Sequence, residues 1–474
     1  MRPSPYNRFK LAQPGRDLTP RQTMFQIFKR WLGTSPSPQL NPDPFGRERK
    51  AATGATGATR PVGQIATAAP VPALVVKREE VVDSKTRIAG YRFSTVLSAS
   101  TDLPKVRLAC DALLAENLAA FAERRVTLLP IVAQNWFRAD YRKLVGPHTV
   151  FLLDPPPQEI EARSRWSEVC KSIRASGARV ALSGIEIGLD AHPLLADADL
   201  LVVDFASYSL GNFEMAMARI KRNHPEIEII VDGLQSWPER RLCTARGADY
   251  CLGPYTTSAD AEQQPGEINQ GRMALIEMLN LLRRDADVAE ITETAKRHPE
   301  VALKIVAMAN SPMQGLAKPV ASIEQAVMVL GRQELYRWLS IGMYRAGADA
   351  PRDEILLELA LARGRFLELV ASDRLGKAEC EELFLVGLLS LLDCMLGVPM
   401  ARVLERLRLS DAMSDVLLRS EGPLGQYLML AIAVEKGRDD AIARLAVKLN
   451  LSEERIGAAW AEAFTWTDNA MQGV

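Results

Sequence analysis

The chain has 474 residues, of which 47% are hydrophobic and 24% are charged, and its formal net charge is zero. These values are typical of a globular protein of two or three domains, and no apolar run reaches the roughly 18 residues of a spanning helix. Residues 1–78 carry a charge balance of +10 and the remaining residues a balance of −10. An acidic body argues against nucleic acid as a partner, because binding phosphates requires a basic face.

Residues 1–85 are rich in Pro, Gly, Ala, Thr and Arg, and we predict that they form a disordered basic leader. The run AATGATGATR at residues 51–60 has no apolar period and cannot offset the entropy lost on ordering. Such a leader could also touch an acidic surface or a membrane. Translation could start at Met1 or at Met24, and no secretory signal is visible.

The six cysteines lie far apart and form no CxxC pair, so we expect free and mostly buried thiols. A zinc site needs clustered ligands, and a disulfide framework is typical of short secreted chains. The sequence therefore predicts a cytoplasmic protein with no metal and no cofactor. The cysteines are Cys110, Cys170, Cys243, Cys251, Cys380 and Cys394.

Short apolar runs alternate with helical stretches between residues 86 and 258. Several of these runs are apolar throughout, as expected for strands that are covered on both faces. Repeated strand–helix units predict a parallel sheet that is open or closed into a barrel. The predicted strands include 125–129, 149–153, 179–182, 200–203 and 228–231, and the predicted helices include 103–123, 157–176 and 210–223.

The strand pattern disappears after residue 258, and residues 265–470 are predicted to form an all-α domain. Glycines and prolines separate its helical stretches. The predicted helices are 268–283, 288–296, 299–309, 322–330, 332–344, 353–372, 380–396, 400–407, 411–419, 425–435, 439–449 and 453–465.

The all-α region carries a recognisable series of phrases: HPEV at 298–301, LKIV at 303–306, ANS at 309–311, ASIEQAV at 321–327, LGR at 330–332 and FLVGLLSLLD at 384–393. Together they resemble the HDOD domain over about residues 265–468. The signature positions are mainly structural, since Asn, Ser, Pro and Gly suit helix ends and close packing. They are Pro299, Asn310, Ser311, Gly331, Gly387 and Asp393.

The HDOD resemblance implies a protein-interaction or output module that is related to the HD hydrolases. Those enzymes need paired His and Asp ligands, because metal-assisted phosphate hydrolysis uses ions to activate water. This chain contains no His-Asp dipeptide. We therefore expect no metallohydrolase site in the helical half and a protein partner of unknown identity.

Read in register with the HDOD region, residues 88–255 resemble an EAL domain, a modified TIM barrel that hydrolyses cyclic-di-GMP with two metal ions. The Glu-Ala-Leu signature falls on Arg92, Phe93 and Ser94, so a cation replaces the metal-binding glutamate. A pair of metal-binding aspartates is replaced by Ser183 and Gly184.

Further along the resemblance, Gln235 replaces the glutamate that serves as a base. Asp154, Asp204 and Asp232 are the carboxylates that remain at predicted strand ends. They would line the mouth of a barrel or cap local loops, and Arg92 would bind a phosphate or form an internal ion pair.

These observations predict an α/β TIM-like barrel with a degenerate EAL site, followed by an all-α HDOD domain. The expected function is non-catalytic signal transduction through protein–protein interaction, and an active phosphodiesterase is not expected because several metal carboxylates are replaced together. The alternative is a receptor that binds cyclic-di-GMP without hydrolysing it.

Overall fold

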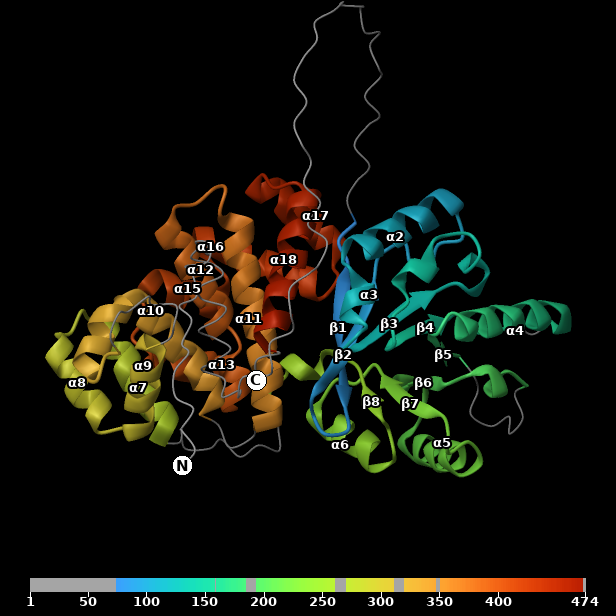
Figure 1. Cartoon of the computed structure of the whole chain (residues 1–474), viewed down its shortest axis with the longest axis horizontal. Helices are drawn as coiled ribbons and strands as arrows, with labels where there is room; N and C mark the ends of the chain where they lie inside the picture. Colours follow the sequence, from blue (N-terminus) through green and yellow to red (C-terminus); the bar gives the residue numbers. More distant parts are fainter. Residues whose placement is uncertain are drawn as a thin grey trace, which may run out of the picture.

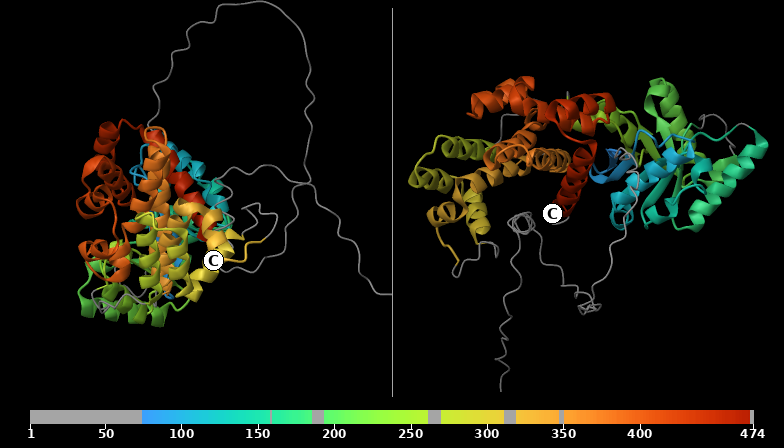
Figure 2. Two further views of the ribbon diagram at one scale, coloured as in Figure 1. Left: turned by 90° about the vertical axis from the view of Figure 1, so that its left-hand side faces the viewer. Right: turned by 90° about the horizontal axis from the view of Figure 1, so that it is seen from above.

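The computed structural model describes residues 74–157, 159–184, 193–260, 270–310, 319–346 and 350–471. These residues form two halves that lie side by side, a strand barrel with helices around it and a larger helical body (Figures 1 and 2). The leader predicted for residues 1–85 lies outside the described residues as far as residue 73.

Eight strands close into a barrel in chain order. The first strand runs antiparallel to both of its neighbours, and all the other pairs are parallel. The strands are β1 Lys77–Asp83, β2 Ile88–Ser94, β3 Val126–Ile131, β4 Thr149–Leu153, β5 Arg179–Leu182, β6 Leu200–Asp204, β7 Glu228–Asp232 and β8 Tyr250–Cys251. The helices around them are α2 Leu103–Ala115, α3 Leu118–Phe121, α4 Ile160–Ala175, α5 Leu210–Asn223 and α6 Trp237–Ala245. The predicted TIM-like barrel is confirmed.

The predicted boundary between leader and barrel at residue 85 is wrong, because β1 lies before it. This strand closes the barrel by pairing with both β2 and β8. Val81 and Val82 are fully buried in it. Its charged residues have partners in the fold, such as Glu116 for Arg78 and Arg92 for Glu79. The composition of this strand is that of a solvated segment, but its charged side chains are paired within the fold.

Small and branched apolar side chains fill the interior of the barrel, as in other closed barrels of this size. Alternate residues of the same strands point outward and form a second cluster beneath the surrounding helices. The interior cluster is Val81, Leu128, Val150, Ala181, Leu200, Val202, Ile230 and Leu252.

The helical half begins at Gln270 and contains only helices among its described residues. Within the described part of the chain no single helix is long and apolar enough to cross a membrane, although the bent pair Lys377–Leu396 and Met400–Arg406 would pass by length and composition. The helices are α7 Gln270–Arg283, α8 Val288–Lys296, α9 Pro299–Ala309, α10 Ile323–Arg345, α11 Ala350–Ala371, α12 Lys377–Leu389, α13 Leu392–Leu396, α14 Met400–Arg406, α15 Asp411–Arg419, α16 Gly422–Glu435, α17 Asp439–Leu449 and α18 Glu453–Met471.

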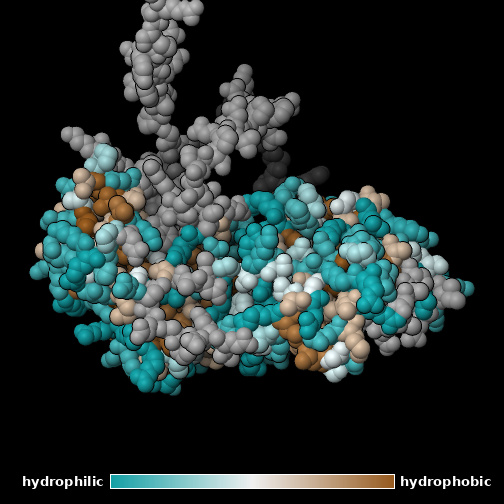
Figure 3. Space-filling model, turned by 90° about the horizontal axis from the view of Figure 1, so that it is seen from below, coloured by the Kyte–Doolittle hydropathy of each residue, from teal (hydrophilic) through white to brown (hydrophobic). Residues whose placement is uncertain are grey.

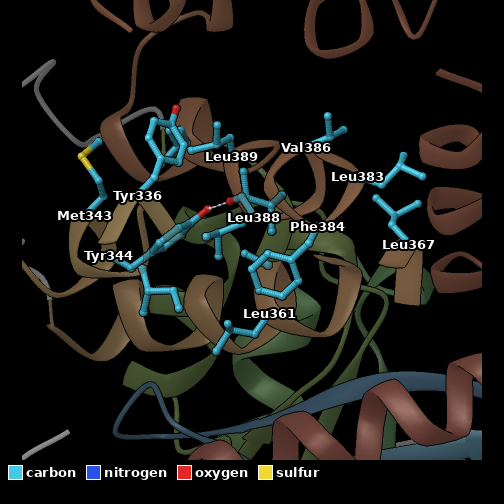
Figure 4. Packing of buried hydrophobic residues seen from close by; sticks show 14 of the residues in the cluster. Tyr336, Met343, Tyr344, Leu361, Leu367, Leu383, Phe384, Val386, Leu388 and Leu389 are labelled. Atoms are coloured by element: carbon cyan, nitrogen blue, oxygen red, sulfur yellow. Dashed lines mark hydrogen bonds between the residues drawn. The ribbon is translucent and has the colours of Figure 1, made fainter. Parts of the chain in front are cut away.

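One continuous apolar core runs through the helical half, from α7 to α18. Figure 4 shows part of it, where Tyr344 of α10 reaches across to α12. The Tyr344 hydroxyl donates a hydrogen bond of 2.5 Å to the carbonyl oxygen of Leu388. Because the core continues well beyond α14, α15 to α18 belong to the same domain as α7 to α14.

The two halves meet where β1, β2 and α3 contact α11 and α18. Phe464 of α18 packs against three aromatic side chains of the barrel half, with ring centroids 5.0 Å from Tyr91, 5.4 Å from Phe121 and 5.7 Å from Phe93. Glu358 of α11 accepts hydrogen bonds from the Tyr91 hydroxyl at 2.8 Å and from Arg125 at 2.6 Å. The interface is therefore both apolar and ion-paired.

Candidate functional site

The mouth of the barrel, at the carboxyl ends of the parallel strands, is where barrel proteins usually place their functional groups. Arg92 lies there because it is the third residue from the end of β2, and Asp232 is the last residue of β7. Asp204 ends β6 and lies beside Asp232 in the strand register. Glu79 reaches the same place from the antiparallel β1, where it lies opposite Arg92.

Arg92 forms ion pairs with two carboxylates across the mouth. Its Nε donates to Glu79 Oε2 at 2.7 Å, and its two Nη atoms bond to the carboxylate oxygens of Asp232, one of them at 3.3 Å. The side chain of Arg92 is 16% exposed. Arg92 is thus an internal ion-pair residue in this structure, which is one of the two roles predicted for it.

The protonation states of this ion pair follow from burial and charge. Burial disfavours the charged guanidinium, but the hydrogen bond to Glu79 and the charge of Asp232 outweigh it and raise the pKa of Arg92. Burial also disfavours the charged form of Glu79, but the hydrogen bond from Arg92 prevails and lowers the pKa of Glu79. Arg92 is therefore a fixed cation at the mouth.

Two further predicted residues, Asp154 and Ser183, hold the backbone around the mouth. Asp154 follows β4, and its Oδ1 accepts a hydrogen bond of 2.6 Å from the backbone N–H of Ala133. Ser183 follows β5, and its hydroxyl donates to the carbonyl oxygen of Leu153 at 3.0 Å. Gly184 follows directly with φ +66°, a conformation that favours glycine. These contacts agree with the reading of Asp154 as a loop carboxylate.

Asp204 and Gln235 also bond to nearby residues. Asp204 caps the short 3₁₀ turn Phe205–Ser207, since it accepts from the Ala206 N–H at 3.3 Å and from the Ser207 hydroxyl at 2.5 Å. The Gln235 side-chain amide donates to the carbonyl oxygen of Gly233 at 2.9 Å. Asp204 therefore acts as a cap, whereas Asp232 is held by Arg92.

Phe93 and Ser94 do not join the cluster of ionic residues at the mouth, although both were predicted to belong to it. Successive side chains of a strand point to opposite faces, so Phe93 points out of the barrel while Arg92 points in. Phe93 is fully buried against Phe121 and Phe464. Ser94 lies opposite Lys77 and lines a small cavity of about 110 Å³ beside α16 and α17.

The residues at the mouth do not fit the two-metal centre that the EAL resemblance implies. Within the described residues, no group of three or more His, Cys, Asp or Glu side chains is placed to hold a metal ion. The guanidinium of Arg92 already neutralises Asp232. Two neighbouring divalent cations need several free carboxylates. At this mouth the Arg92 guanidinium already lies between the carboxylates of Glu79 and Asp232.

Sequence reasoning missed Glu79, which is the second carboxylate partner of Arg92. It was assigned to the leader, because KREEVVD has four charged residues in succession. The signal that could have placed it is the buried pair Val81 and Val82 shortly before a turn at residues 84–85, which follows the strand directly. Only the register of β1 against β2 pairs Glu79 with Arg92.

The predicted HDOD signature positions have structural roles, apart from Ser311, which lies outside the described residues. Pro299 is the first residue of α9. The Asn310 side chain ties the end of α9 to the segment before α10, because it donates to the Val320 carbonyl at 2.7 Å and accepts from its N–H at 2.6 Å. Asp393 lies in the first turn of α13 and accepts from the Cys394 N–H.

Two signature glycines permit unusual backbone geometry. Gly331 interrupts α10 with φ 72° and ψ 164°, so the two helices predicted on either side of it are confirmed. A Cβ atom at Gly387 would lie 2.5 Å from Gly364 Cα, which means that α11 and α12 cross at backbone contact. The predicted structural role of these two positions therefore has a geometric basis.

A family model described as the HDOD domain matches residues 272–402, within the helical half. The chain thus contains an HDOD domain, and the predicted order of a barrel followed by an HDOD domain is confirmed.

Two curated proteins are similar to parts of the chain. The uncharacterized protein YuxH of Bacillus subtilis is 26% identical over 200 residues, which are 41% of this chain and 48% of that protein. The cyclic di-GMP phosphodiesterase CdgJ of Vibrio cholerae is 25% identical over 185 residues, 39% of this chain and 43% of that protein. The chain thus spans about half the length of the curated relatives it matches.

Several solved structures of EAL domains are similar to the chain over about two fifths of its length. An EAL domain protein from Listeria monocytogenes has a TM-score of 0.29 at 16% identity and covers 39% of this chain and 87% of its own. BlrP1 of Klebsiella pneumoniae, in a complex with calcium and cyclic-di-GMP, has a TM-score of 0.33 at 14% identity and covers 39% of this chain and 55% of its own. The FimX EAL domain of Xanthomonas citri, in complex with cyclic-di-GMP, has a TM-score of 0.32 at 13% identity and covers 39% of this chain and 87% of its own.

Proposed function

We propose that this chain is a non-catalytic protein of cyclic-di-GMP signalling, which acts through a protein partner bound by its HDOD domain. The observation that carries the proposal is the ion pair of Arg92 with Glu79 and Asp232 at the barrel mouth. A fixed guanidinium at this position repels divalent cations and competes with them for Asp232. Without those cations, no phosphodiester hydrolysis of the two-metal type can proceed.

The other mouth carboxylates support the same proposal. Asp154 accepts a hydrogen bond from the backbone N–H of Ala133 in the neighbouring loop after β3, and Asp204 accepts one from the N–H of Ala206 in its own loop. Binding a metal would require them to give up these bonds, which position the loops after β3 and β6. The barrel then serves as a scaffold that presents the helical half, to which it is joined through Phe464 and Glu358.

The first test is a titration of the purified chain with cyclic-di-GMP in Mg²⁺ or Mn²⁺, with the recovered nucleotide analysed for cleavage. The proposal expects no cleavage under either metal. A matched variant, Arg92→Glu, restores a carboxylate at the signature position and should still not hydrolyse the nucleotide, because Ser183 and Gly184 supply no carboxylate. Metal-dependent cleavage by the unaltered chain would overturn the proposal.

The second candidate is a receptor that binds cyclic-di-GMP without cleaving it. The observation in its favour is Arg92 itself, because a guanidinium held by two carboxylates can exchange one of them for a phosphate. Arg92→Ala should then abolish nucleotide binding, whereas Arg138→Ala, which removes an exposed arginine of the neighbouring β3–β4 connection, should leave it intact. Equal affinity in both variants would dismiss this candidate.

A crosslinking experiment tests which half binds the partner. A photoreactive residue is placed at exposed apolar positions of the HDOD domain, Leu303 or Met328, and at exposed positions of the barrel half, Leu210 or Met215. The proposal expects a partner to be captured from the first two positions in the full chain. Capture from the barrel positions alone would contradict the assignment of the partner to the HDOD domain.

We also propose that the chain works in the cytoplasm. All six cysteines are free and buried, as was predicted, and free thiols are typical of a reducing compartment. Burial raises the pKa of Cys170 to about 12 and that of Cys110 to about 11, so these thiols are unreactive.

A further inference from the structure

A hollow of about 650 Å³ lies in the HDOD domain between the end of α7, the break in α10 and the start of α12. Its volume is in the range of small-molecule sites. We call it the α10 cavity. Leu282, Leu330 and Leu385 form its apolar walls. Its polar lining includes Arg283, Asp285, Arg332, Gln333, Glu334, Tyr336, Arg337, Lys377, Glu381 and Glu382.

The break in α10 shapes this cavity. Gly331 has φ 72° and ψ 164°, a combination that is essentially restricted to glycine, and it lines the cavity. A Cβ atom there would meet no other atom within 4 Å, so the space beside it is open. The residues that follow the break, Arg332 and Gln333, also line the cavity.

Tyr336 lines the cavity, and its buried hydroxyl group has no hydrogen-bond partner among the described residues. The residue is only 6% exposed, and no described group bonds to its hydroxyl. Tyr344, two turns further along α10, shows the usual arrangement, because its hydroxyl bonds to Leu388. Figure 4 shows the Tyr336 hydroxyl pointing away from that pair. Burying an unpaired hydroxyl is unfavourable, which makes Tyr336 a candidate ligand contact.

Two arginines add further donors to the same wall. Arg332 donates to the Ala286 carbonyl through one Nη at 2.5 Å, while its other Nη is buried and has no partner among the described residues. The Nε of Arg337 is likewise buried without a partner. Arg283 lies close enough for its charge to act on Tyr336, against the burial that raises the pKa of Tyr336 to about 12. All these groups can donate, so the missing group is an acceptor.

The carboxylates of the lining limit the charge of that acceptor. Glu334 accepts a hydrogen bond from Trp338, and Glu381 pairs with Lys377. Asp285 and Glu382 remain beside the cavity, where they would repel a polyanion. The cavity therefore suits one acidic group on an apolar body rather than a nucleotide with several phosphates.

We propose that the α10 cavity binds a small organic anion. Its single carboxylate or phosphate group accepts hydrogen bonds from Tyr336 and Arg332, and its apolar body packs against Leu282, Leu330 and Leu385. This site is separate from the barrel mouth and does not depend on the function proposed above.

The test uses benzoate and phenyl phosphate as probes, with benzyl alcohol as a neutral control of similar shape. Binding to the full-length chain is measured by ligand-observed NMR and by the shift in thermal unfolding. We expect saturable binding of benzoate or phenyl phosphate with a Kd at or below about 5 mM, and none for benzyl alcohol.

Two variants assign the binding to the cavity. Tyr336→Phe removes only the unpaired hydroxyl, so it should keep the fold and weaken binding roughly tenfold. Arg332→Gln should weaken it at least as much. Tyr427→Phe, a buried tyrosine of α16 outside the cavity, should bind as the unaltered chain does. The proposal is overturned if neither anion binds, or if Tyr336→Phe binds with unchanged affinity.

Discussion

The Tyr91 hydroxyl donates a hydrogen bond of 2.8 Å to Glu358, a residue 267 positions further along the chain. The two residues belong to different halves, β2 of the barrel and α11 of the helical body. Arg92, the next residue of β2, points into the barrel and binds Asp232. A single strand therefore links the mouth of the barrel to the helical half through adjacent residues.

The ion pair between the halves predicts a large loss of stability when it is broken. Arg125→Met leaves Glu358 and Asp468 buried without their shared cation, and should lower the free energy of unfolding by about 3 kcal/mol in urea denaturation. Arg246→Met removes an exposed pair with Glu214 and should cost less than about 1 kcal/mol. Equal losses of unfolding free energy in the two variants would mean that the interface ion pair stabilises the chain no more than an exposed pair does.

The aromatic cluster predicts a shared response of the two halves. Phe464→Ala removes the ring that contacts Tyr91, Phe93 and Phe121, and should destabilise the chain by about 2–4 kcal/mol. Hydrogen exchange measured by mass spectrometry should rise in both β2 and α18. Phe137→Ala, at a ring that is 62% exposed, should leave the exchange unchanged. Faster exchange confined to α18 would show that the halves are independent.

The crossing of α11 and α12 predicts opposite effects of two glycine substitutions. Gly387→Ala places a methyl group 2.5 Å from backbone atoms of Gly364, and should destabilise the chain by about 1–3 kcal/mol. Gly457→Ala, in the open surroundings of α18, should stabilise it by about 0.5–1 kcal/mol. Thermal unfolding distinguishes them by sign, and a neutral Gly387→Ala would contradict the close crossing.

Glu80 predicts a pH dependence of stability near neutrality. Burial raises the pKa of Glu80 to about 7, and the nearby carboxylates of Glu435 and Glu79 act in the same direction against the hydrogen bond from Thr256. The folded state therefore holds a proton that the unfolded state releases near pH 4.5. The contribution of Glu80 to the free energy of unfolding therefore falls as pH rises from about 4.5 to about 7, and it is lost above that range.

Glu80→Gln should remove this dependence. The free energy of unfolding that the variant gains over the unaltered chain should be about 2 kcal/mol larger at pH 8 than at pH 5. Urea denaturation at the two pH values measures the difference. Glu214→Gln, on the exposed surface of α5, serves as the control and should leave the profile unaltered. A profile that is the same with and without Glu80 would show that Glu80 is ionised throughout this range.

Much of the fold follows from local pattern. The strands 149–153 and 179–182 were predicted with their observed bounds, because they are continuous apolar runs that end at polar residues. The helices 288–296, 299–309 and 411–419 were also predicted with their observed bounds, since prolines, cap residues and charged ends delimit them.

Contacts between distant segments were harder to predict. The charges of β1 have their partners as far away as Glu116, so they looked like a solvated segment. Phe93 was placed in the site because an alignment gives position but not the face of the strand. The pairing of Arg125 with Glu358 depends on how the halves dock, for which neither segment carries a local signal.

The antiparallel direction of β1 determines where the preceding chain is attached. Lys77, the first residue of the strand, lies opposite Ser94, the last residue of β2, so the polypeptide enters the barrel at its mouth rather than at the opposite end. An affinity tag or reporter fused shortly before this strand is therefore tethered beside Arg92, whereas one fused after Met471 follows α18. For the nucleotide titration, the choice of terminus for the tag is part of the experimental design.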